Sequence, residues 1–271
     1  MKRLCLILAA AAMILITACG TREAVAERVT NVYASVILDV PEPDPRLIAL
    51  SEDRIMAANA LDGNTRFECY DFAGEPTGSL DIPMIAECFA ILPDGGIVVC
   101  GASELIIFRD GEPTQLCGDV ASLFESAEAE SEIASGRFAI QQILIDGEGD
   151  ICLFSKTSLV CIGQDGAKRC EIAVGNLTDA AVSEGGIVVS CYDKSGKWTC
   201  RRVDKSAGRL SGTMELPTGL DLRSCTLKSG GGYEIYIDDG DLLWGYDDGE
   251  LVPLCSWINS DIIRSAGRSA I

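Results

Sequence analysis

From Pro45 onward, short apolar runs alternate with turns rich in Asp, Gly, Ser and Glu, and one arrangement of four apolar runs recurs five times. The turns between the first and second runs are Ser51–Asp53, Pro93–Gly96, Asp146–Asp150, Ser183–Gly186 and Ser229–Gly232. The turns between the third and fourth runs are Ala73–Glu75, Asp110–Glu112, Gln164–Gly166, Ser206–Gly208 and Asp248–Glu250. Asp-Gly between alternating apolar runs is a strong hairpin signal, because type I′ turns need residues with positive φ. Each unit is therefore predicted to form four antiparallel strands.

The spacing of these units predicts an all-β, β-propeller-like fold. The glycines of the third-to-fourth turns are separated by 37, 55, 42 and 41 residues. Four short strands in about 40 residues is the period of a propeller blade. Five units predict about five four-stranded blades, or six if a strand near the N-terminus belongs to a degenerate blade. A β-sandwich or an open β-meander with the same hairpins is the alternative.

Two segments depart from the repeat. Residues 121–136 account for the longest interval, and their Ala, Glu and Ser content predicts a short helix or a loop. The strand-like segment from Tyr33 to Val40 precedes the first unit, as a fourth strand would. We expect this N-terminal strand to pair with the last unit and close the ring, because an unpaired sheet edge invites aggregation.

The N-terminus has the layout of an export signal. Met1-Lys2-Arg3 is followed by an apolar run from Leu4 to Ile16, which is shorter than the roughly 20 apolar residues that a bilayer span needs. The run ends Ile16-Thr17-Ala18-Cys19, which resembles the lipobox of bacterial lipoproteins, where the Cys receives the lipid. The sequence predicts a lipoprotein signal peptide over residues 1–18 and lipid attachment at Cys19. An ordinary signal peptide or an uncleaved anchor is the alternative.

Lipid on Cys19 sets the expected location. Several acyl chains on one residue give stable anchoring, since each buried methylene contributes about 0.8 kcal/mol. We therefore expect the protein at the cell membrane, lipid-anchored on the extracytoplasmic face. Residues 19–32 are then the lipidated Cys and a spacer, and residues 33–257 are the propeller.

Charge and composition narrow the function classes. The net charge is −19, and loss of Lys2 and Arg3 with the signal makes it two units more negative. Such a surface argues against nucleic acid as a partner and favours a basic or neutral protein, peptide or glycan. The chain has no histidine, which excludes Ser-His-Asp, Cys-His and His-metal schemes. We predict no catalytic, cofactor-binding or metal-ligating residues, and no set of polar residues is seen to converge on loops at one mouth of the ring.

The cysteines follow the strand pattern. Thirteen are present; without Cys5 and Cys19 the number is odd, so they cannot all pair within the chain. Cys152, Cys161 and Cys170 are nine residues apart and are predicted to lie opposite one another on neighbouring strands. Cys191 and Cys200 are predicted to face each other across Ser195-Gly196. We interpret these residues as small, buried, mostly free thiols; a disulfide set or a soft-metal site is the alternative, although no Cys-x-x-Cys is present.

Other polar and aromatic clusters are interpreted as structural. Asp238–Asp241 and Asp247–Glu250 lack the ligand spacing of a calcium loop, and Asp and Gly are the residues that hairpin turns require. Trp198, Trp244 and Trp257 lie in apolar runs, which favours core packing over sugar stacking.

The order of segments resembles a group of lipoproteins from anaerobic Gram-positive bacteria, in which a lipobox, a spacer and an acidic-Pro strand precede a propeller. Here that strand and its sequel are Tyr33–Glu42. In the group, a Trp-containing strand leads into an extracellular solute-binding domain, and the matching junction here is Leu254–Ile262. Only nine residues follow Ile262, so residues 258–271 are a C-terminal tail, or the junction of a truncated domain.

This resemblance implies a binding or accessory module at the cell surface, linked to solute uptake. Two alternatives stay open. One is a propeller-type hydrolase or lyase that uses carboxylates, and the other is a structural scaffold.

Overall fold

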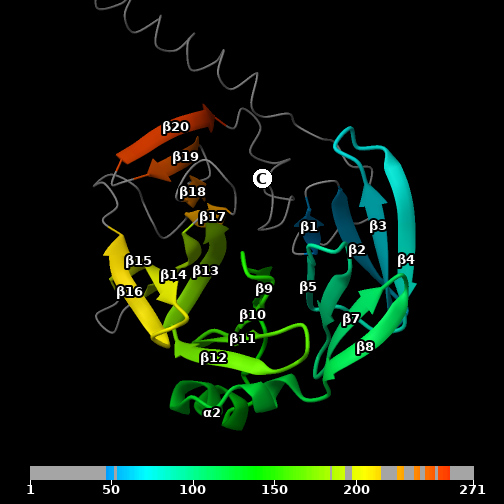
Figure 1. Cartoon of the computed structure of the whole chain (residues 1–271), viewed down its shortest axis with the longest axis horizontal. Helices are drawn as coiled ribbons and strands as arrows, with labels where there is room; N and C mark the ends of the chain where they lie inside the picture. The colour runs from blue at the N-terminus through cyan, green and yellow to red at the C-terminus, as the bar shows by residue number, and fades with distance from the viewer. Residues whose placement is uncertain are drawn as a thin grey trace, which may run out of the picture.

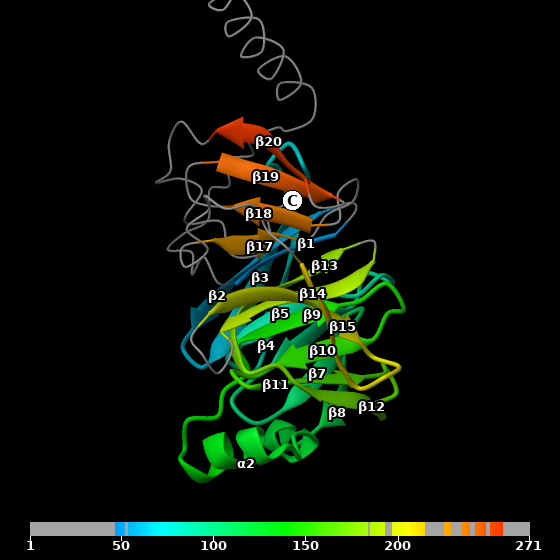
Figure 2. The same ribbon diagram turned by 90° about the vertical axis from the view of Figure 1, so that its left-hand side faces the viewer.

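The computed structural model describes residues 47–51, 54–183, 185–192, 197–214, 225–228, 235–238, 242–247 and 250–256. Within them, five four-stranded antiparallel sheets stand as blades around a central axis (Figure 1). Seen from the side, the strands of the blades lie one above another (Figure 2). The chain is a five-bladed β-propeller, so the predicted fold class is confirmed and the sandwich and open meander are excluded.

Each blade is a meander of four consecutive strands. Blade 1 contains β1 (Ile48–Leu50), β2 (Ile55–Leu61), β3 (Asn64–Tyr70) and β4 (Pro76–Ile82). Blade 2 contains β5 (Cys88–Ile91), β6 (Ile97–Cys100), β7 (Leu105–Arg109) and β8 (Glu112–Cys117). Blade 3 contains β9 (Gln142–Ile145), β10 (Ile151–Phe154), β11 (Ser158–Ile162) and β12 (Lys168–Ala173). Blade 4 contains β13 (Asn176–Ser183), β14 (Gly186–Tyr192), β15 (Trp198–Asp204) and β16 (Arg209–Met214). Blade 5 contains β17 (Thr226–Lys228), β18 (Ile235–Asp238), β19 (Leu242–Asp247) and β20 (Glu250–Ser256).

The hydrophobicity of each strand follows its position in the blade, from the innermost to the outermost strand. β6 and β10 are buried at every residue, because neighbouring blades cover both faces of a middle strand, and such strands are continuous apolar runs. The outermost strand β8 is exposed over most of its length. The predicted Asp-Gly turn between β7 and β8 has positive φ at both central residues, 51° at Asp110 and 82° at Gly111, as a type I′ turn requires.

The hydrophobic core lies between blades rather than at the centre of the ring. One cluster joins side chains of blades 2 and 3, including Ile107 and Leu153, and another joins Phe154 of blade 3 to Val189 of blade 4. Fully burying each such side chain contributes about 1.5–3 kcal/mol. Trp198 lies in the cluster between blades 4 and 5, with Trp244 packed against it, so core packing is confirmed for these two residues.

Buried polar contacts add directional links between the innermost strands. The Gln142 side-chain amide in β9 donates to the carbonyl of Ala180 in β13 over 2.9 Å. The carboxylate of Asp179 in β13 accepts the backbone N–H of Leu227 in β17, also over 2.9 Å. Such hydrogen bonds fix one blade against the next, because a buried polar group must find its partner at a defined position.

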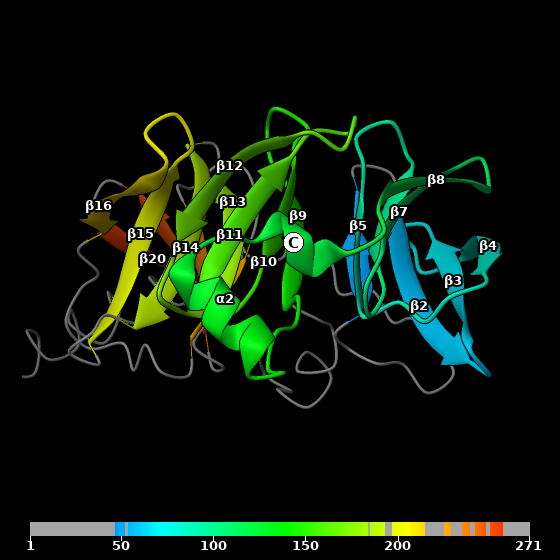
Figure 3. The ribbon, with the colours of Figure 1, turned by 90° about the horizontal axis from the view of Figure 1, so that it is seen from below.

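The predicted insertion forms a short helix against blade 3. It contains a 3₁₀ turn, η1 (Val120–Leu123), and the helix α2 (Ala127–Ala134), which lies outside β12, the outermost strand of the blade (Figures 1 and 3). The carboxylate of Glu171 in β12 accepts the backbone N–H groups of Glu125 and Ser126, at 2.9 and 2.7 Å. The helix therefore covers a strand edge that would otherwise be open to pairing with another chain.

Several predictions fall on residues that the structure does not describe. They are the signal peptide at 1–18, Cys19 with its spacer, the closing strand Tyr33–Val40 and the tail at 258–271. Closure of the ring by the N-terminal strand therefore stays a prediction. Among the described residues, no helix is long and apolar enough to span a bilayer.

Candidate functional site

A polar pocket of about 450 Å³ lies between blades 3 and 4. Three hairpin turns form it: the β9–β10 turn of blade 3, and the β13–β14 and β15–β16 turns of blade 4. These turns meet because the first and third turns of an antiparallel meander lie at the same end of the sheet. The lining residues are Asp146, Gly147, Glu148, Ser183, Gly185, Gly186, Ile187, Arg202, Val203, Asp204, Lys205, Ser206 and Ser211.

The acidic β9–β10 turn is organised by its first residue. Asp146 Oδ1 accepts the backbone N–H groups of Glu148 and Asp150, each over 2.9 Å. This is the local hydrogen bonding for which Asp is favoured in turns. Because the loop wraps around the Asp146 side chain, the carboxylates of residues 146, 148 and 150 point to one place and lie within 4.8 Å of one another.

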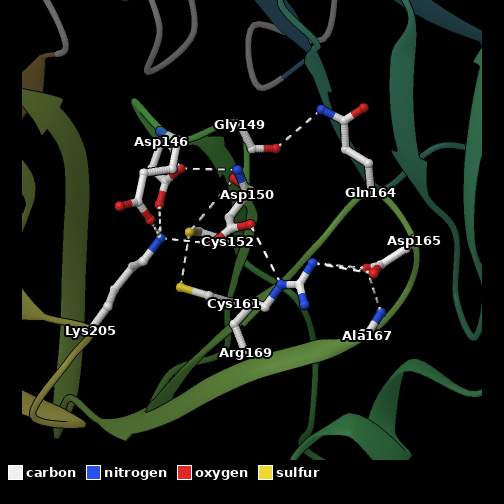
Figure 4. A network of polar contacts seen from close by, with 11 residues as sticks. Asp146, Gly149, Asp150, Cys152, Cys161, Gln164, Asp165, Ala167, Arg169 and Lys205 are labelled. Carbon is white, nitrogen blue, oxygen red and sulfur yellow. Dashed lines mark hydrogen bonds and ion pairs between the residues drawn. The ribbon is translucent and has the colours of Figure 1, made fainter.

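The ammonium group of Lys205, from the β15–β16 turn of the next blade, lies among these three carboxylates (Figure 4). Its Nζ is 2.5 Å from Asp146 Oδ2, 2.6 Å from Glu148 Oε2 and 2.7 Å from Asp150 Oδ2. The side chains of Asp146 and Glu148 are 6% and 76% exposed. The contact with Asp146 therefore holds the blades together more strongly than the screened contact with Glu148.

The charge balance of this cluster limits its chemistry. Partial burial of Lys205 disfavours its charged form, but hydrogen bonds to Asp146, Asp150 and Glu148 outweigh this, so its pKa is raised well above the usual value. The amine therefore stays protonated at neutral pH and does not serve as a base or nucleophile. Three carboxylate oxygens are also what a hard cation prefers, and here Lys205 supplies the compensating positive charge.

Further polar contacts link this turn to blade 2. The Gln164 side-chain amide in the β11–β12 turn donates to the carbonyl of Gly149 over 3.2 Å, as Figure 4 shows. The Gln164 carbonyl oxygen accepts from Arg109 Nη2 over 2.5 Å, and Arg109 Nε is 2.7 Å from Asp94 Oδ2. The hydrogen bond from Arg109 lowers the pKa of Asp94. A continuous line of polar contacts thus crosses blades 2, 3 and 4 on one face of the ring.

The sequence alone does not reveal this site. The prediction that no polar residues converge on the loops is wrong, because Asp146, Glu148, Asp150 and Lys205 come together. Carboxylates at alternating positions of one turn are the only local signal. Lys205 lies 55 residues beyond Asp150, and nothing in the repeat marks it as a partner. The acidic segments Asp238–Asp241 and Asp247–Glu250, which the sequence predicts to be turns, lie largely outside the described residues.

The cysteine predictions have mixed outcomes. Cys152 pairs with Cys161, and Cys161 with Cys170, in the strand registers of blade 3, so the predicted row of three is confirmed. The prediction for Cys191 and Cys200 is wrong, because Cys191 pairs with Thr199 and Cys200 with Ser190. The loop between the paired strands contains an odd number of residues, 193–197. A shift of one residue moves a side chain to the other face of the sheet.

Many of the described cysteines are free thiols, as the sequence suggested. They include Cys88, Cys100, Cys117, Cys152, Cys161, Cys170, Cys191 and Cys200. Most of them are buried in the packing between blades, which agrees with their interpretation as small hydrophobic residues.

Comparison with known proteins supports the architecture alone. No protein-family model and no curated protein matches the sequence. Solved structures do match. PorZ, an essential bacterial surface component of the type-IX secretion system of Porphyromonas gingivalis, has a TM-score of 0.53 and 13% identity, over 82% of this chain and 29% of that one. A gluconolactonase from Xanthomonas campestris has a TM-score of 0.52 and 14% identity, over 79% of this chain and 76% of that one. Virginiamycin B lyase from Staphylococcus aureus has a TM-score of 0.49 and 12% identity, over 83% and 88%.

The likenesses to PorZ and to the gluconolactonase support the fold seen in the structure. At such low identities they assign no activity to this chain, since one propeller scaffold hosts many unrelated functions.

Proposed function

We propose that this protein is a lipid-anchored, extracytoplasmic binding module whose ligand site is the pocket between blades 3 and 4. The observation that carries the proposal is the chemistry of this pocket. Its charged and hydroxyl groups are arranged for polar recognition, and its one lysine is held in the protonated state.

The serine hydroxyls of the pocket are engaged with neighbouring acceptors. Ser183 Oγ donates to the carbonyl of Gly186 over 2.9 Å, and Ser206 Oγ donates to Asp204 Oδ1 over 2.7 Å. The hydrogen bond from Ser206 also lowers the pKa of Asp204, which makes this carboxylate a weaker base. A nucleophilic serine needs a competent general base beside it, so these pairs favour binding over acyl transfer through a serine.

The net negative charge of the chain favours a basic or neutral ligand. A peptide with Lys or Arg side chains, a neutral glycan or the basic surface of a partner protein meets this condition. The sequence resembles lipoproteins in which a propeller precedes a solute-binding domain, and this resemblance supports an accessory role in solute uptake.

Lipid on Cys19 would place the propeller outside the membrane surface. The spacer at residues 20–32 spans at most about 45 Å when fully extended. This reach lets the pocket face either the membrane or a neighbouring protein, and several acyl chains on Cys19 would keep the propeller attached.

The alternative is a hydrolase or lyase that uses carboxylates, and the clustering of three carboxylates at the pocket is the observation that favours it. A panel of esterase, lyase and glycosidase substrates, tested with the full chain in detergent, separates the two functions. We expect no turnover. Turnover that disappears in Glu148→Gln but persists in Glu128→Gln, a matched change on α2, would overturn the binding proposal.

The anchor is tested separately by Cys19→Ser. We expect the parent protein to enter the detergent-rich phase with residues 1–18 removed, and the variant to remain an uncleaved precursor or to be released. A variant that partitions and migrates like the parent contradicts lipid attachment at Cys19.

A further inference from the structure

Three cysteines form a row beneath the polar pocket in blade 3. Cys152 on β10, Cys161 on β11 and Cys170 on β12 are successive register partners. The first two are completely buried, whereas Cys170 is half-buried on the outermost strand. All three pack in the hydrophobic cluster between blades 3 and 4, and Lys205 acts electrostatically on Cys161 and Cys170. Figure 4 shows Cys152 and Cys161 next to the Lys205 cluster.

The two buried sulfur atoms are close enough to bond with little movement. Cys152 Sγ and Cys161 Sγ are 3.0 Å apart, about 1 Å more than the length of a disulfide bond. Directly opposed residues of an antiparallel pair have Cα atoms about 4.5–5.5 Å apart, which is within the range that disulfides accept. Two thiolates that share a tetrahedral zinc ion would lie about 3.8 Å apart, so the short distance favours a disulfide over a metal.

We propose that Cys152, Cys161 and Cys170 form a thiol–disulfide exchange site, in which Cys170 reacts first with an external disulfide and Cys152–Cys161 is the final disulfide. The inference is independent of the binding function. The co-reactant is a small disulfide, R–S–S–R, that reaches the half-buried Cys170 on the face of β12 that packs toward blade 4, opposite the face on which Glu171 holds α2.

The exchange balances in three steps. The Cys170 thiolate attacks R–S–S–R, forms a mixed disulfide and releases one thiolate, which takes up a proton to become R–SH. The Cys161 thiolate then attacks Cys170 Sγ and releases the second R–SH. Finally, the Cys152 thiolate attacks Cys161 Sγ and returns Cys170 to its thiol. Two thiols are oxidised by two electrons, and one R–S–S–R is reduced to two R–SH.

Blade 2 provides the internal control for this inference. It also contains a register pair of cysteines, Cys88 on its first strand β5 and Cys100 on its second strand β6. The next partner is Leu105, and a thiol returns only at Cys117 on the outermost strand. Because Leu105 interrupts the row, a disulfide at Cys117 cannot pass to Cys100. Exchange should therefore be confined to blade 3.

The protonation of Cys170 sets the rate of the first step. Burial, with the neighbouring Cys161, raises the pKa of Cys170 to about 12. The thiolate is the attacking species, and the hydrogen bond with Cys152, together with burial, raises the pKa of Cys161, the attacking thiol of the second step, even further. Both steps are therefore slow at neutral pH. The rate of the first step should rise about tenfold per pH unit between pH 7 and 9, because the thiolate fraction rises by that factor.

The test uses the reduced full chain in detergent and cystamine, a cationic disulfide that suits an acidic protein. After acid quenching and alkylation, peptide mass spectrometry identifies the disulfides. We expect Cys152–Cys161 to form first, and Cys170→Ser to slow it at least tenfold, whereas Cys117→Ser, the matched change in blade 2, leaves it unchanged. Cys161→Ala should leave one cysteamine disulfide-bonded to Cys170, with the other cysteamine released.

Three results overturn the proposal. One is an unchanged rate of Cys152–Cys161 formation in Cys170→Ser. Another is the formation of Cys88–Cys100 at the same rate as Cys152–Cys161. The third is the absence of a mixed disulfide at Cys170 in Cys161→Ala, provided that this variant melts as cooperatively as the parent.

Discussion

Blades 2 and 3 are built on the same four-strand unit, yet their first turns have different partners. In blade 2, Asp94 Oδ1 accepts the N–H of Gly96 and Oδ2 pairs with Arg109 of the same blade. In blade 3, Asp146 organises its turn in the same way, but its other oxygen pairs with Lys205 of blade 4. The two turns therefore share the same local hydrogen bonding, which the repeat encodes. They differ in the cation that pairs with the Asp: Arg109 belongs to the same blade as Asp94, whereas Lys205 belongs to the next blade and links it to Asp146.

The same contrast holds for the outer edges of the two blades. The outermost strand of blade 3 is covered by α2, whose N-terminal backbone is held by Glu171. The outermost strand of blade 2 is largely exposed. Blade 3 therefore combines an interblade pocket, a row of three thiols and a covered edge. Both the proposed ligand pocket and the proposed exchange site lie on this blade.

The largest predicted difference between the two turns is in stability. Asp146→Ala removes an acceptor for two backbone N–H groups and a buried partner of Lys205, and should lower the free energy of unfolding by about 2–4 kcal/mol. Asp94→Ala, at a half-exposed side chain, should cost about 1 kcal/mol or less. Chemical denaturation of both variants measures the difference. Equal losses of unfolding free energy in the two variants would show that the contact between Asp146 and Lys205 adds no stability beyond that of the turn itself.

The next largest effect depends on pH. Lys205→Met should cost about 1–2 kcal/mol at pH 8, because two partly buried hydrogen bonds and one exposed hydrogen bond to carboxylates are lost. The raised pKa of Lys205 means that above about pH 10.4, the usual lysine value, the folded chain keeps a proton that the unfolded chain loses. The difference in unfolding free energy between the parent and the variant should therefore shrink as the pH rises above this value. A difference that grows in that range would contradict a stabilising role for the protonated Lys205 side chain.

A smaller difference is expected at the glycines of the third-to-fourth turns. Gly111 and Gly166 both have positive φ, 82° and 79°, so Ala at either position costs about 1–2 kcal/mol of backbone strain. A Cβ on Gly166 would also lie 3.2 Å from the carbonyl oxygen of Leu116 in blade 2, whereas a Cβ on Gly111 meets only Leu80 Cδ1 at 4.0 Å. Gly166→Ala should thus lower the melting temperature more than Gly111→Ala. The reverse order would mean that blades 2 and 3 do not pack closely at this turn.

The smallest effect is predicted at the covered edge. Ser126 caps α2 through Ala129 N over 3.3 Å and contacts Ser158 Oγ over 2.6 Å. Ser126→Ala should cost about 1 kcal/mol and speed hydrogen exchange in α2, while the amides of β7 in blade 2 stay as protected as before. Unchanged exchange in α2 would show that this cap does not hold the helix on blade 3.

The contrast between the blades also explains what the sequence could predict. The Asp110-Gly111 turn and the row of Cys152, Cys161 and Cys170 follow from local spacing, because hairpin register depends on loop length and on alternation along the strand. The error at Cys200 came from one residue of loop length, which local spacing leaves open. The pairing of Asp146 with Lys205 depends on how two blades pack, and no local pattern encodes that contact.

The most direct test of the central claim is binding to the pocket between blades 3 and 4. The full chain in detergent is titrated with a library of Lys- and Arg-containing peptides and with neutral glycans, in parallel with Glu148→Gln and Glu128→Gln. We predict saturable binding that weakens at least tenfold in Glu148→Gln and is unchanged in Glu128→Gln. Equal binding by both variants and the parent, or no binding by the parent, contradicts the pocket as the ligand site.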